Sequence, residues 1–461
     1  MLFSTPFFIF AFLPVFFALY WFLPARGIVL LLGSLLFYGW SEPVFLWVFL
    51  ASACLDWALG WKIAGEGKAR KWALWTGVAS NLGLLFYAKY TVFAVVNLNA
   101  VLAATKLSTL PVPSIALPLG VSFIVFEKIT YLVDLYRGVS VPARSLLNYL
   151  NYVFLFPKLL AGPIVKYHDI AGQLGAPTHC YEDVREGVLR FLTGLAKKVL
   201  IADFLAAAAD AVFKLPADAL HTSTAWFGVV CFTLQIFFDF SGYSDMAIGM
   251  ARILGFRLLE NFRDPYLATS FTDFWRRWHI SLSTWIKEYL YIPLGGSRIS
   301  VRRSYLNLCI CFFLSGLWHG ASWNYVIWGC FHGVILVLDR VFWLEWQKRL
   351  PRVVNIAITF LLITLAFVVF RCETMAHALY YFGALFGVHA TQPDRFFFNP
   401  DTCLALTVGV IYILFPLVKW PQWAQPGENR VPQLALALVL LVCSIAWMGM
   451  STFHPFLYFR F

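Results

Sequence analysis

The sequence has few charged residues and long stretches with none. Only 13% of its 461 residues are Asp, Glu, Lys or Arg, whereas 61% are hydrophobic and the mean hydropathy is +0.73. Soluble domains have about 25% charged residues, so this scarcity excludes an ordinary soluble protein. The charge-free runs at 1–24, 305–338 and 431–459 are long enough for spanning helices of about 20 residues. We therefore predict a polytopic membrane protein.

Short catalytic and metal-binding motifs are also missing. The nine cysteines form no CxxC or zinc-type spacing, and the chain has no HExxH, no GxSxG, no Gly-rich phosphate loop and no DxD pair. His279, His319 and His332 lack the i+3 or i+4 spacing of a helical metal site, so we predict no metal and no permanently bound cofactor. The 35 Lys and Arg residues, against 24 acids, gather in short loops, where we expect them to orient the chain in the bilayer rather than to bind nucleic acid.

The apolar runs predict an all-α protein with about ten to twelve transmembrane or re-entrant helices in one membrane domain, residues 1–461. The first run has no basic region and no small-residue cleavage site, so we expect a retained helix rather than a signal peptide. Two polar stretches interrupt the pattern. Residues 117–138 carry Glu127 and Lys128, which either lie at the interface or line a cavity. Residues 181–205 have the stripe of an interfacial helix.

The third polar stretch is the most informative. Ser270 and Asp273 have the spacing of a helix capping box, and an aromatic stripe follows over residues 271–289 that includes Trp275 and Trp278. We predict one amphipathic helix along the membrane surface that forms the wall of a cavity. The stripe suits a membrane anchor or a substrate site. His279 lies at the border of this stripe, where an interfacial role is favoured over chemistry.

The run 305–338 is too long for one crossing. As a single helix it would measure about 51 Å, against a hydrocarbon core of about 30 Å. The break is predicted at WHGASWN, which contains Trp318, His319 and Asn324. His319 suits either a structural hydrogen bond or chemistry, since ionisable groups at membrane depth are often functional. For His332, packing is the favoured interpretation.

Two acids in DFSGYSD, Asp239 and Asp245, stand close to Tyr243. They suit a cation or proton site, and helix-end hydrogen bonding explains them equally well. A buried histidine remains as a candidate general base. Its ordinary pKa near 6.5 leaves it mostly neutral at pH 7, able to take the proton of a hydroxyl that attacks an acyl thioester.

Several segments, in order, closely resemble the membrane-bound O-acyltransferase superfamily and its bacterial alginate O-acetylation branch. They are LPLGVSF, YLVDLYRG, LLAGPIVKY, DFSGYSDMAIGMARILGF, ENFRDPY, FWRRWHISLSTWIKEYLYIPLGG and GLWHGASWNYVIWGCFHG. The resemblance implies a multi-helix disc in which funnels from both sides meet at a histidine tunnel. It assigns the superfamily's signature histidine to His319 and the second histidine of the bacterial branch to His279. The remaining candidates for substrate binding are Asp239, Tyr243, Asp245, Trp275, Trp278, Trp318 and Asn324.

The resemblance also implies an activity. Acetyl groups from cytoplasmic acetyl-CoA would cross the bacterial inner membrane, and a periplasmic SGNH-hydrolase-like partner would deliver them to an exported polysaccharide. After Phe123 the chain reads IVFEKIT, which departs from the Tyr-Thr-Phe pattern of the alginate branch. The acceptor therefore stays open among alginate, cellulose and peptidoglycan, and D-alanyl transfer is a further alternative. Rivals of other classes are a proton- or cation-coupled transporter and a scaffold that anchors a periplasmic enzyme.

Overall fold

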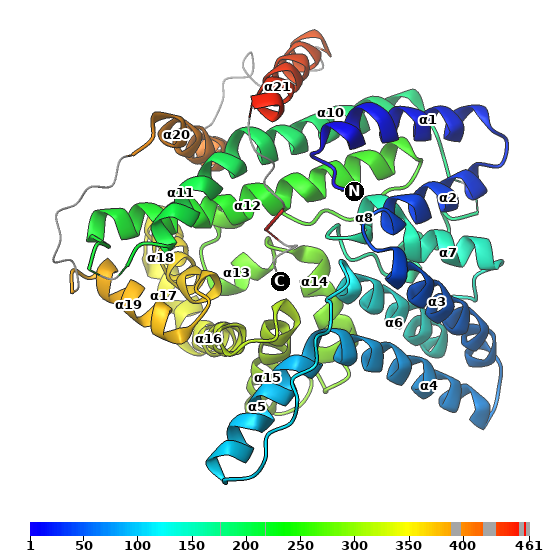
Figure 1. The fold of residues 1–461 in the computed structure, drawn as a ribbon, viewed down its shortest axis with the longest axis horizontal. Coiled ribbons are helices and arrows are strands. Elements are labelled where there is room, and N and C mark those ends of the chain that lie inside the picture. The colour runs from blue at the N-terminus through cyan, green and yellow to red at the C-terminus, as the bar shows by residue number, and fades with distance from the viewer. Residues whose placement is uncertain (176, 217, 389–397, 418–429, 451–455, 458–461) are drawn as a thin grey trace. The chain divides into compact units, whose positions relative to one another are not determined.

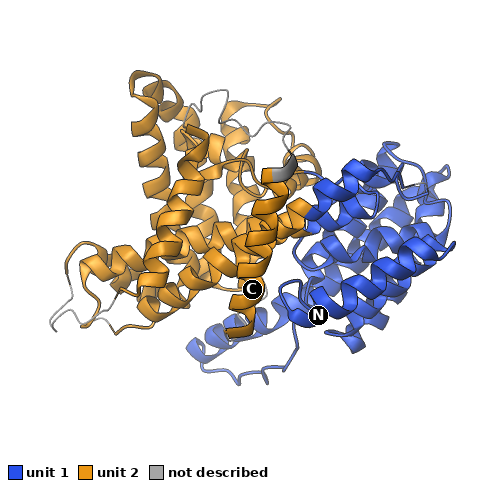
Figure 2. Ribbon diagram, turned by 90° about the horizontal axis from the view of Figure 1, so that it is seen from above, with its two compact units in different colours: residues 1–188, 247–259 blue, residues 189–246, 260–461 orange. Residues whose placement is uncertain are grey.

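The computed structural model describes residues 1–175, 177–216, 218–388, 398–417, 430–450 and 456–457, and this part of the chain forms helices and no strand. It divides into two compact units (Figure 2): residues 1–188 with 247–259, and residues 189–246 with 260–461. The prediction of an all-α protein is confirmed, whereas a single membrane domain stays a prediction.

Unit 1 is built from the N-terminal helices, which Figure 1 shows in blue and cyan. Their bounds are η1 Phe8–Phe12, α1 Leu13–Phe22, α2 Arg26–Gly39, α3 Pro43–Ala64, α4 Lys68–Leu85, η2 Phe86–Tyr90, α5 Thr91–Ala104, α6 Val121–Arg137, α7 Leu146–Phe154, α8 Phe156–Leu159 and α9 Tyr167–Ile170. The first half of α10 (Tyr181–Ala196) and the end of α12 (Thr222–Ile253) also belong to it.

Buried ion pairs lie inside unit 1. Lys128 Nζ is 3.1 Å from a carboxylate oxygen of Asp56, and Lys158 pairs with Glu127. Glu127 and Lys128 are only 1% and 0% exposed, so both side chains lie inside the unit, and whether they stand at the depth of the interface or line a cavity stays a prediction. Partners that are remote in the sequence neutralise both charges, which lowers the free-energy cost of burying them.

Unit 2 contains the remaining helices. They are the end of α10, η3 Lys197–Ala202, α11 Asp203–Phe213, most of α12, η4 Pro265–Leu267, α13 Phe271–Trp275, α14 Ile280–Ile286, η5 Lys287–Tyr291, α15 Val301–His319, α16 Trp323–Leu338, η6 Asp339–Trp343, α17 Leu344–Trp346, η7 Gln347–Arg349, α18 Arg352–Arg371, α19 Met375–Leu385, α20 Pro400–Leu414, η8 Phe415–Leu417 and α21 Arg430–Met450. The helix predicted in residues 181–205 is confirmed as α10 with η3, and Glu182 and Asp183 lie in its first turn.

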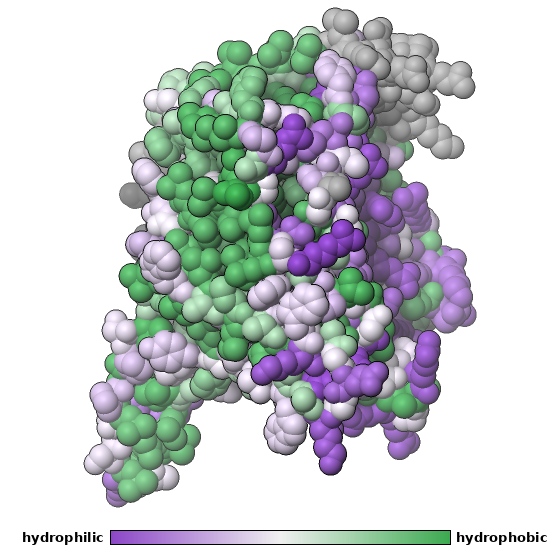
Figure 3. Space-filling model, turned by 90° about the vertical axis from the view of Figure 1, so that its right-hand side faces the viewer, coloured by the Kyte–Doolittle hydropathy of each residue, from purple (hydrophilic) through white to green (hydrophobic). Residues whose placement is uncertain are grey.

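The membrane character is evident in both units. Among the described residues, seven helices are long and apolar enough to cross a membrane: 43–64, 68–104, 222–253, 323–349, 352–371, 400–417 and 432–450. Residues 8–22 and 26–39 form shorter apolar helices. Figure 3 shows a face on which hydrophobic residues form a continuous field, with hydrophilic residues gathered along one side. The chain is a multi-pass membrane protein.

The break predicted in the run 305–338 is confirmed. Helix α15 ends at His319, and α16 begins at Trp323. The two helices pack along each other (Figure 1), and glycines allow their backbones to touch. A Cβ on Gly316 would overlap the carbonyl oxygen of Tyr325 and lie 3.1 Å from the Cα of Gly329. This tight hairpin fixes the end of α15, where His319 stands.

The single amphipathic helix predicted over residues 271–289 is wrong, because the chain turns at His279 between α13 and α14. His279 has the left-handed backbone angles φ 45° and ψ 54°, which non-glycine residues rarely adopt. The carbonyl oxygen of Asn261 accepts the N–H of Ile280 at 2.9 Å, and this hydrogen bond stabilises the turn. The N-cap of the predicted capping box is confirmed, since the hydroxyl of Ser270 accepts the backbone N–H of Asp273 at 3.1 Å. The carboxylate of Asp273 accepts the N–H of Thr269 at 3.1 Å rather than that of Ser270.

Candidate active site

His319 lies at the C-terminal end of α15 and is only 6% exposed. Its imidazole is enclosed by aromatic rings. The ring centroids of Trp328 and Phe370 are 5.1 and 5.3 Å away, both nearly perpendicular to the imidazole, and the ring of Trp318 is 4.9 Å away. Three different segments, α15, α16 and α18, therefore fix the position of this ring in an apolar setting.

His279 is fully buried, at 0% exposure. The ring of Phe240, from α12, stands at 90° to the imidazole with a centroid distance of 4.7 Å. Burial lowers the pKa of His279 to about 3 because removal from water penalises the charged form. The imidazole is therefore neutral at physiological pH. A strained backbone at a buried histidine is typical of functional sites.

Asn261 determines which nitrogen of His279 carries the proton. Its Oδ1 accepts the backbone N–H of Ser281 at 3.2 Å and the hydroxyl of Ser281 at 2.8 Å, while its Nδ2 donates to Ser244 at 3.1 Å. These bonds assign the amide orientation, so the contact of 3.1 Å between Oδ1 and His279 Nδ1 has the imidazole as donor. In a neutral imidazole, the lone pair then resides on Nε2.

Trp318 connects the two histidines. Its ring centroid lies 5.9 Å from that of His279 and 4.9 Å from that of His319. Residues 40 positions apart in the sequence therefore contact one indole. The structure thus brings together His279, Trp318 and His319, three of the residues predicted to form the site.

His332 belongs to the same aromatic cluster. The Nε1–H of Trp275 donates to His332 Nδ1 at 3.3 Å, and the ring of Trp328 lies 4.4 Å from that of His332. Trp328 in turn contacts His319. These contacts fit the packing role predicted for His332. They also connect Trp275, through His332 and Trp328, with His319.

The acids of DFSGYSD lie in ion pairs with residues of α10 and η3. Lys198 Nζ is 2.7 Å from Asp239, whose second oxygen accepts the backbone N–H of Leu457 at 2.7 Å. Asp245 pairs with Lys197 at 2.8 Å and with Arg190 at 2.9 Å. These contacts favour a structural role for both acids, and their predicted role in substrate binding stays a prediction.

The other predicted residues have partners of their own. Trp278 packs against Phe262, with ring centroids 5.1 Å apart, and Tyr243 packs against Phe456 at the same distance. Asn324 Nδ2 donates to the carbonyl oxygen of Cys372 at 2.6 Å, which ties the start of α16 to the end of α18. Each is buried, and each has a packing or bonding role that explains it.

The model of the MBOAT, membrane-bound O-acyltransferase family, matches residues 141–375, a segment that contains both histidines. The chain belongs to this family. It is 42% identical to a probable alginate O-acetylase AlgI of Azotobacter vinelandii and 39% identical to one of Pseudomonas putida, with all of both chains covered in each case. It is 37% identical to a peptidoglycan O-acetyltransferase of Helicobacter pylori, over all of this chain and 98% of that protein. The family makes it an O-acyltransferase.

Sequence reasoning missed the residues that hold the histidines of this O-acyltransferase. Asn261, in the segment ENFRDPY, and Phe370 are too far along the chain for spacing to connect them with His279 or His319. Trp328 lies nine residues after His319, on the next helix. Only Asn261 carried a signal, since a lone amide between apolar and charged residues at the start of a polar loop needs a partner once buried.

Proposed function

We propose that this O-acyltransferase moves acetyl groups from cytoplasmic acetyl-CoA across the bacterial inner membrane for O-acetylation of an exported polysaccharide of the alginate type. The relatives named alginate O-acetylases support the acceptor class. The observation that carries the proposal is the arrangement of two buried histidines, His279 and His319, on a shared indole.

In the proposed reaction, His319 is the general base. Its neutral imidazole takes the proton of the acceptor hydroxyl as the oxygen bonds to the carbonyl carbon of the acetyl thioester. The carbon–sulfur bond then breaks, and the proton passes to the leaving thiolate, so that an ester and free CoA result. General base catalysis of this kind contributes about 10² to 10⁴ in rate. The aromatic rings around His319 keep water from competing with the hydroxyl.

His279 acts in substrate positioning. With its Nδ1–H bonded to Asn261, Nε2 is the acceptor end of the ring, suited to the hydroxyl of the incoming acceptor. No proton transfer at His279 is needed. Its backbone, strained by the turn, aims the ring toward Trp318 and so toward the base.

Delivery requires a partner on the far side of the membrane. We propose a periplasmic SGNH-hydrolase-like acetyltransferase that takes the acetyl group to the polysaccharide, together with the polymer export machinery. The chain itself supplies the membrane step and needs no resident cofactor.

Peptidoglycan is the second candidate acceptor. The full-length similarity to the peptidoglycan O-acetyltransferase of Helicobacter pylori favours it over D-alanyl transfer or cellulose acetylation. A proton- or cation-coupled transporter is disfavoured because Asp239 and Asp245, its candidate carriers, are engaged by lysines.

The proposal is tested in cells that lack the native gene and express the wild-type chain or His319→Ala. The measurement is the acetate released by mild alkali from exported polysaccharide and, separately, from peptidoglycan. We expect acetate on the polysaccharide for the wild type and none for His319→Ala at equal membrane abundance. His377→Ala, in α19, is the matched control and should keep full acetylation.

The other outcomes decide between the alternatives. Acetate found only on peptidoglycan would select the second acceptor. Full acetylation by His319→Ala would reject the catalytic proposal and favour a scaffold.

A further inference from the structure

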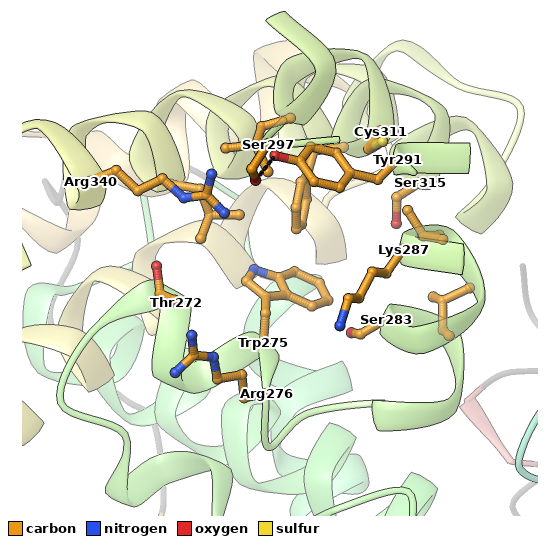
Figure 4. Close-up of a pocket in the computed structure, with 15 residues that line it drawn as sticks. Thr272, Trp275, Arg276, Ser283, Lys287, Tyr291, Ser297, Cys311, Ser315 and Arg340 are labelled. Carbon is orange, nitrogen blue, oxygen red and sulfur yellow. Dashed lines mark hydrogen bonds between the residues drawn. The ribbon is translucent and has the colours of Figure 1, made fainter. Parts of the chain in front are cut away.

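A cavity of about 350 Å³ opens in unit 2 beside the aromatic cluster (Figure 4). Its wall is largely apolar and comes from α13, α14, α15 and α16. The apolar lining residues are Trp275, Leu282, Ile286, Leu308, Cys311, Phe312 and Leu336. A cavity of this size and lining accepts part of an alkyl chain.

Three cations line the same cavity: Arg276, Lys287 and Arg340. All three side chains are exposed, and Figure 4 shows Arg340 and Lys287 on opposite sides of the Trp275 indole. In the part of the chain that the structure describes, none of them has an ion pair with a carboxylate. Three uncompensated positive charges around one opening attract an anion.

Hydroxyl groups complete the polar rim. The hydroxyl of Tyr291 lies 2.8 Å from Ser297 Oγ and 2.9 Å from Ser304 Oγ, and the guanidinium of Arg340 hydrogen-bonds it as well. Ser283 lies beside Lys287 (Figure 4). Arginine, lysine and hydroxyl donors are the groups that bind phosphate oxygens.

The surface next to the opening is apolar. Val334, Leu338, Val341 and Phe342, on α16 and η6, are exposed, and their helix is one of the candidate membrane spans. Exposed apolar side chains directly beside Arg340 are expected where a spanning helix meets the headgroup layer. An exposed apolar surface on a candidate spanning helix therefore adjoins Arg340, which lines the opening.

From this arrangement we propose that the cavity binds an anionic phospholipid, with its phosphate between Arg276, Lys287 and Arg340 and part of one acyl chain against the apolar wall. A soluble phosphate ester has the same phosphate chemistry, but the exposed apolar belt favours the lipid. The bound lipid would brace α13, α14 and α15, the elements that carry Trp275, His279 and His319.

The test is native mass spectrometry of the full chain after delipidation and titration with phosphatidylglycerol or phosphatidylcholine. We expect the wild type to retain phosphatidylglycerol over phosphatidylcholine. The triple variant Arg276→Gln, Lys287→Gln, Arg340→Gln should bind phosphatidylglycerol about 100-fold more weakly, since each basic residue near a membrane contributes about 1 kcal/mol.

Two further triple variants make the result specific. Lys348→Gln, Arg349→Gln, Arg352→Gln removes the same charge from exposed positions outside the cavity and should bind like the wild type. Arg276→Lys, Lys287→Arg, Arg340→Lys keeps the charges and should also retain binding.

Three outcomes would overturn the proposal. They are equal retention of the two lipids by the wild type, equal losses in the cavity and control variants, and displacement of phosphatidylglycerol by inorganic phosphate or CoA at equal concentration. The last would identify the occupant as a soluble phosphate. Lipid retention does not depend on acetyl transfer, so its failure leaves the proposed function untouched.

Discussion

The two histidines of the candidate active site are held by different forces. His279 stands in a loop organised by hydrogen bonds through Asn261, which binds the imidazole, the backbone and two serines. His319 stands at the end of a glycine-packed hairpin and is surrounded by rings. The hydrogen bond to Asn261 fixes the tautomer of His279, whereas packing fixes the position of the His319 ring.

This difference matches the proposed division of work. A residue that orients a hydroxyl needs a defined donor and acceptor end. A base that alternately gains and loses a proton needs a fixed position in a site that excludes water. The comparison therefore predicts that variants of the two regions will fail in different ways.

The largest effect is expected for Gly329→Leu, in the hairpin that carries His319. A Cβ here would overlap the carbonyl oxygen of Phe312 and lie 3.0 Å from the Cα of Gly316, so α15 and α16 must separate. We expect loss of monodisperse protein in size-exclusion chromatography and loss of acetylation. Gly83→Leu, where a Cβ meets nothing within 4 Å, should behave like the wild type. Normal yield and activity for Gly329→Leu would contradict the packing account.

Next in size is Asn261→Ala, in the loop that carries His279. Without the acceptor at Nδ1 the imidazole can take either tautomer and rotate. Leaving a buried hydrogen-bonding group without its partner costs about 1 to 3 kcal/mol, which corresponds to about 10- to 100-fold in activity. The protein should remain folded. Asn355→Ala, which removes another buried amide, is the control and should keep its activity per folded molecule. Equal losses for the two variants would show a structural role only.

Asn261→Asp sharpens this prediction through pH. In the wild type the pKa of His279 is about 3, so the ring stays neutral from pH 5 to 8. A carboxylate at position 261 favours the imidazolium and raises that pKa, and protonation uses the Nε2 lone pair. We expect the activity of Asn261→Asp to fall as the pH is lowered. This fall should begin at a higher pH than in the wild type. Superimposable pH profiles would exclude a neutral His279 in the reaction.

The smallest effect is expected for Trp275→Phe. The substitution keeps most of the ring but removes the N–H that donates to His332, a hydrogen bond with a net contribution of about 1 kcal/mol. We expect acetylation to fall by about 5-fold at most, with a slightly lower melting temperature in differential scanning fluorimetry. A loss as large as that of Asn261→Ala would give the indole a direct role.

Much of this arrangement follows from local sequence. The length of the charge-free run 305–338 required a break, and the polar and small residues around His319 located it. The N-cap at Ser270 also needs only four residues. These features depend on neighbours in the sequence, which is why they are confirmed.

What could not be predicted depends on contacts between distant segments. The aromatic stripe after Ser270 is compatible with one helix until Asn261 draws the backbone at His279 into a turn. Glu127 and Lys128 are costly in isolation, and only Lys158 and Asp56, from other helices, make their burial possible. For Asp239 and Asp245, a cation site and structural hydrogen bonding both stayed open, because spacing does not reveal their partners, Lys198 and Lys197, about 40 to 50 residues upstream.

The most direct test of the account is single-turnover release of CoA by purified protein in nanodiscs, with acetyl-CoA and an acceptor alcohol. His319→Ala and His279→Ala are compared with the wild type. The account predicts that His319→Ala loses the chemical step at every acceptor concentration, by about 10² to 10⁴. His279→Ala should recover part of its rate as the acceptor concentration rises. A His319→Ala protein that releases CoA at the wild-type rate would contradict it.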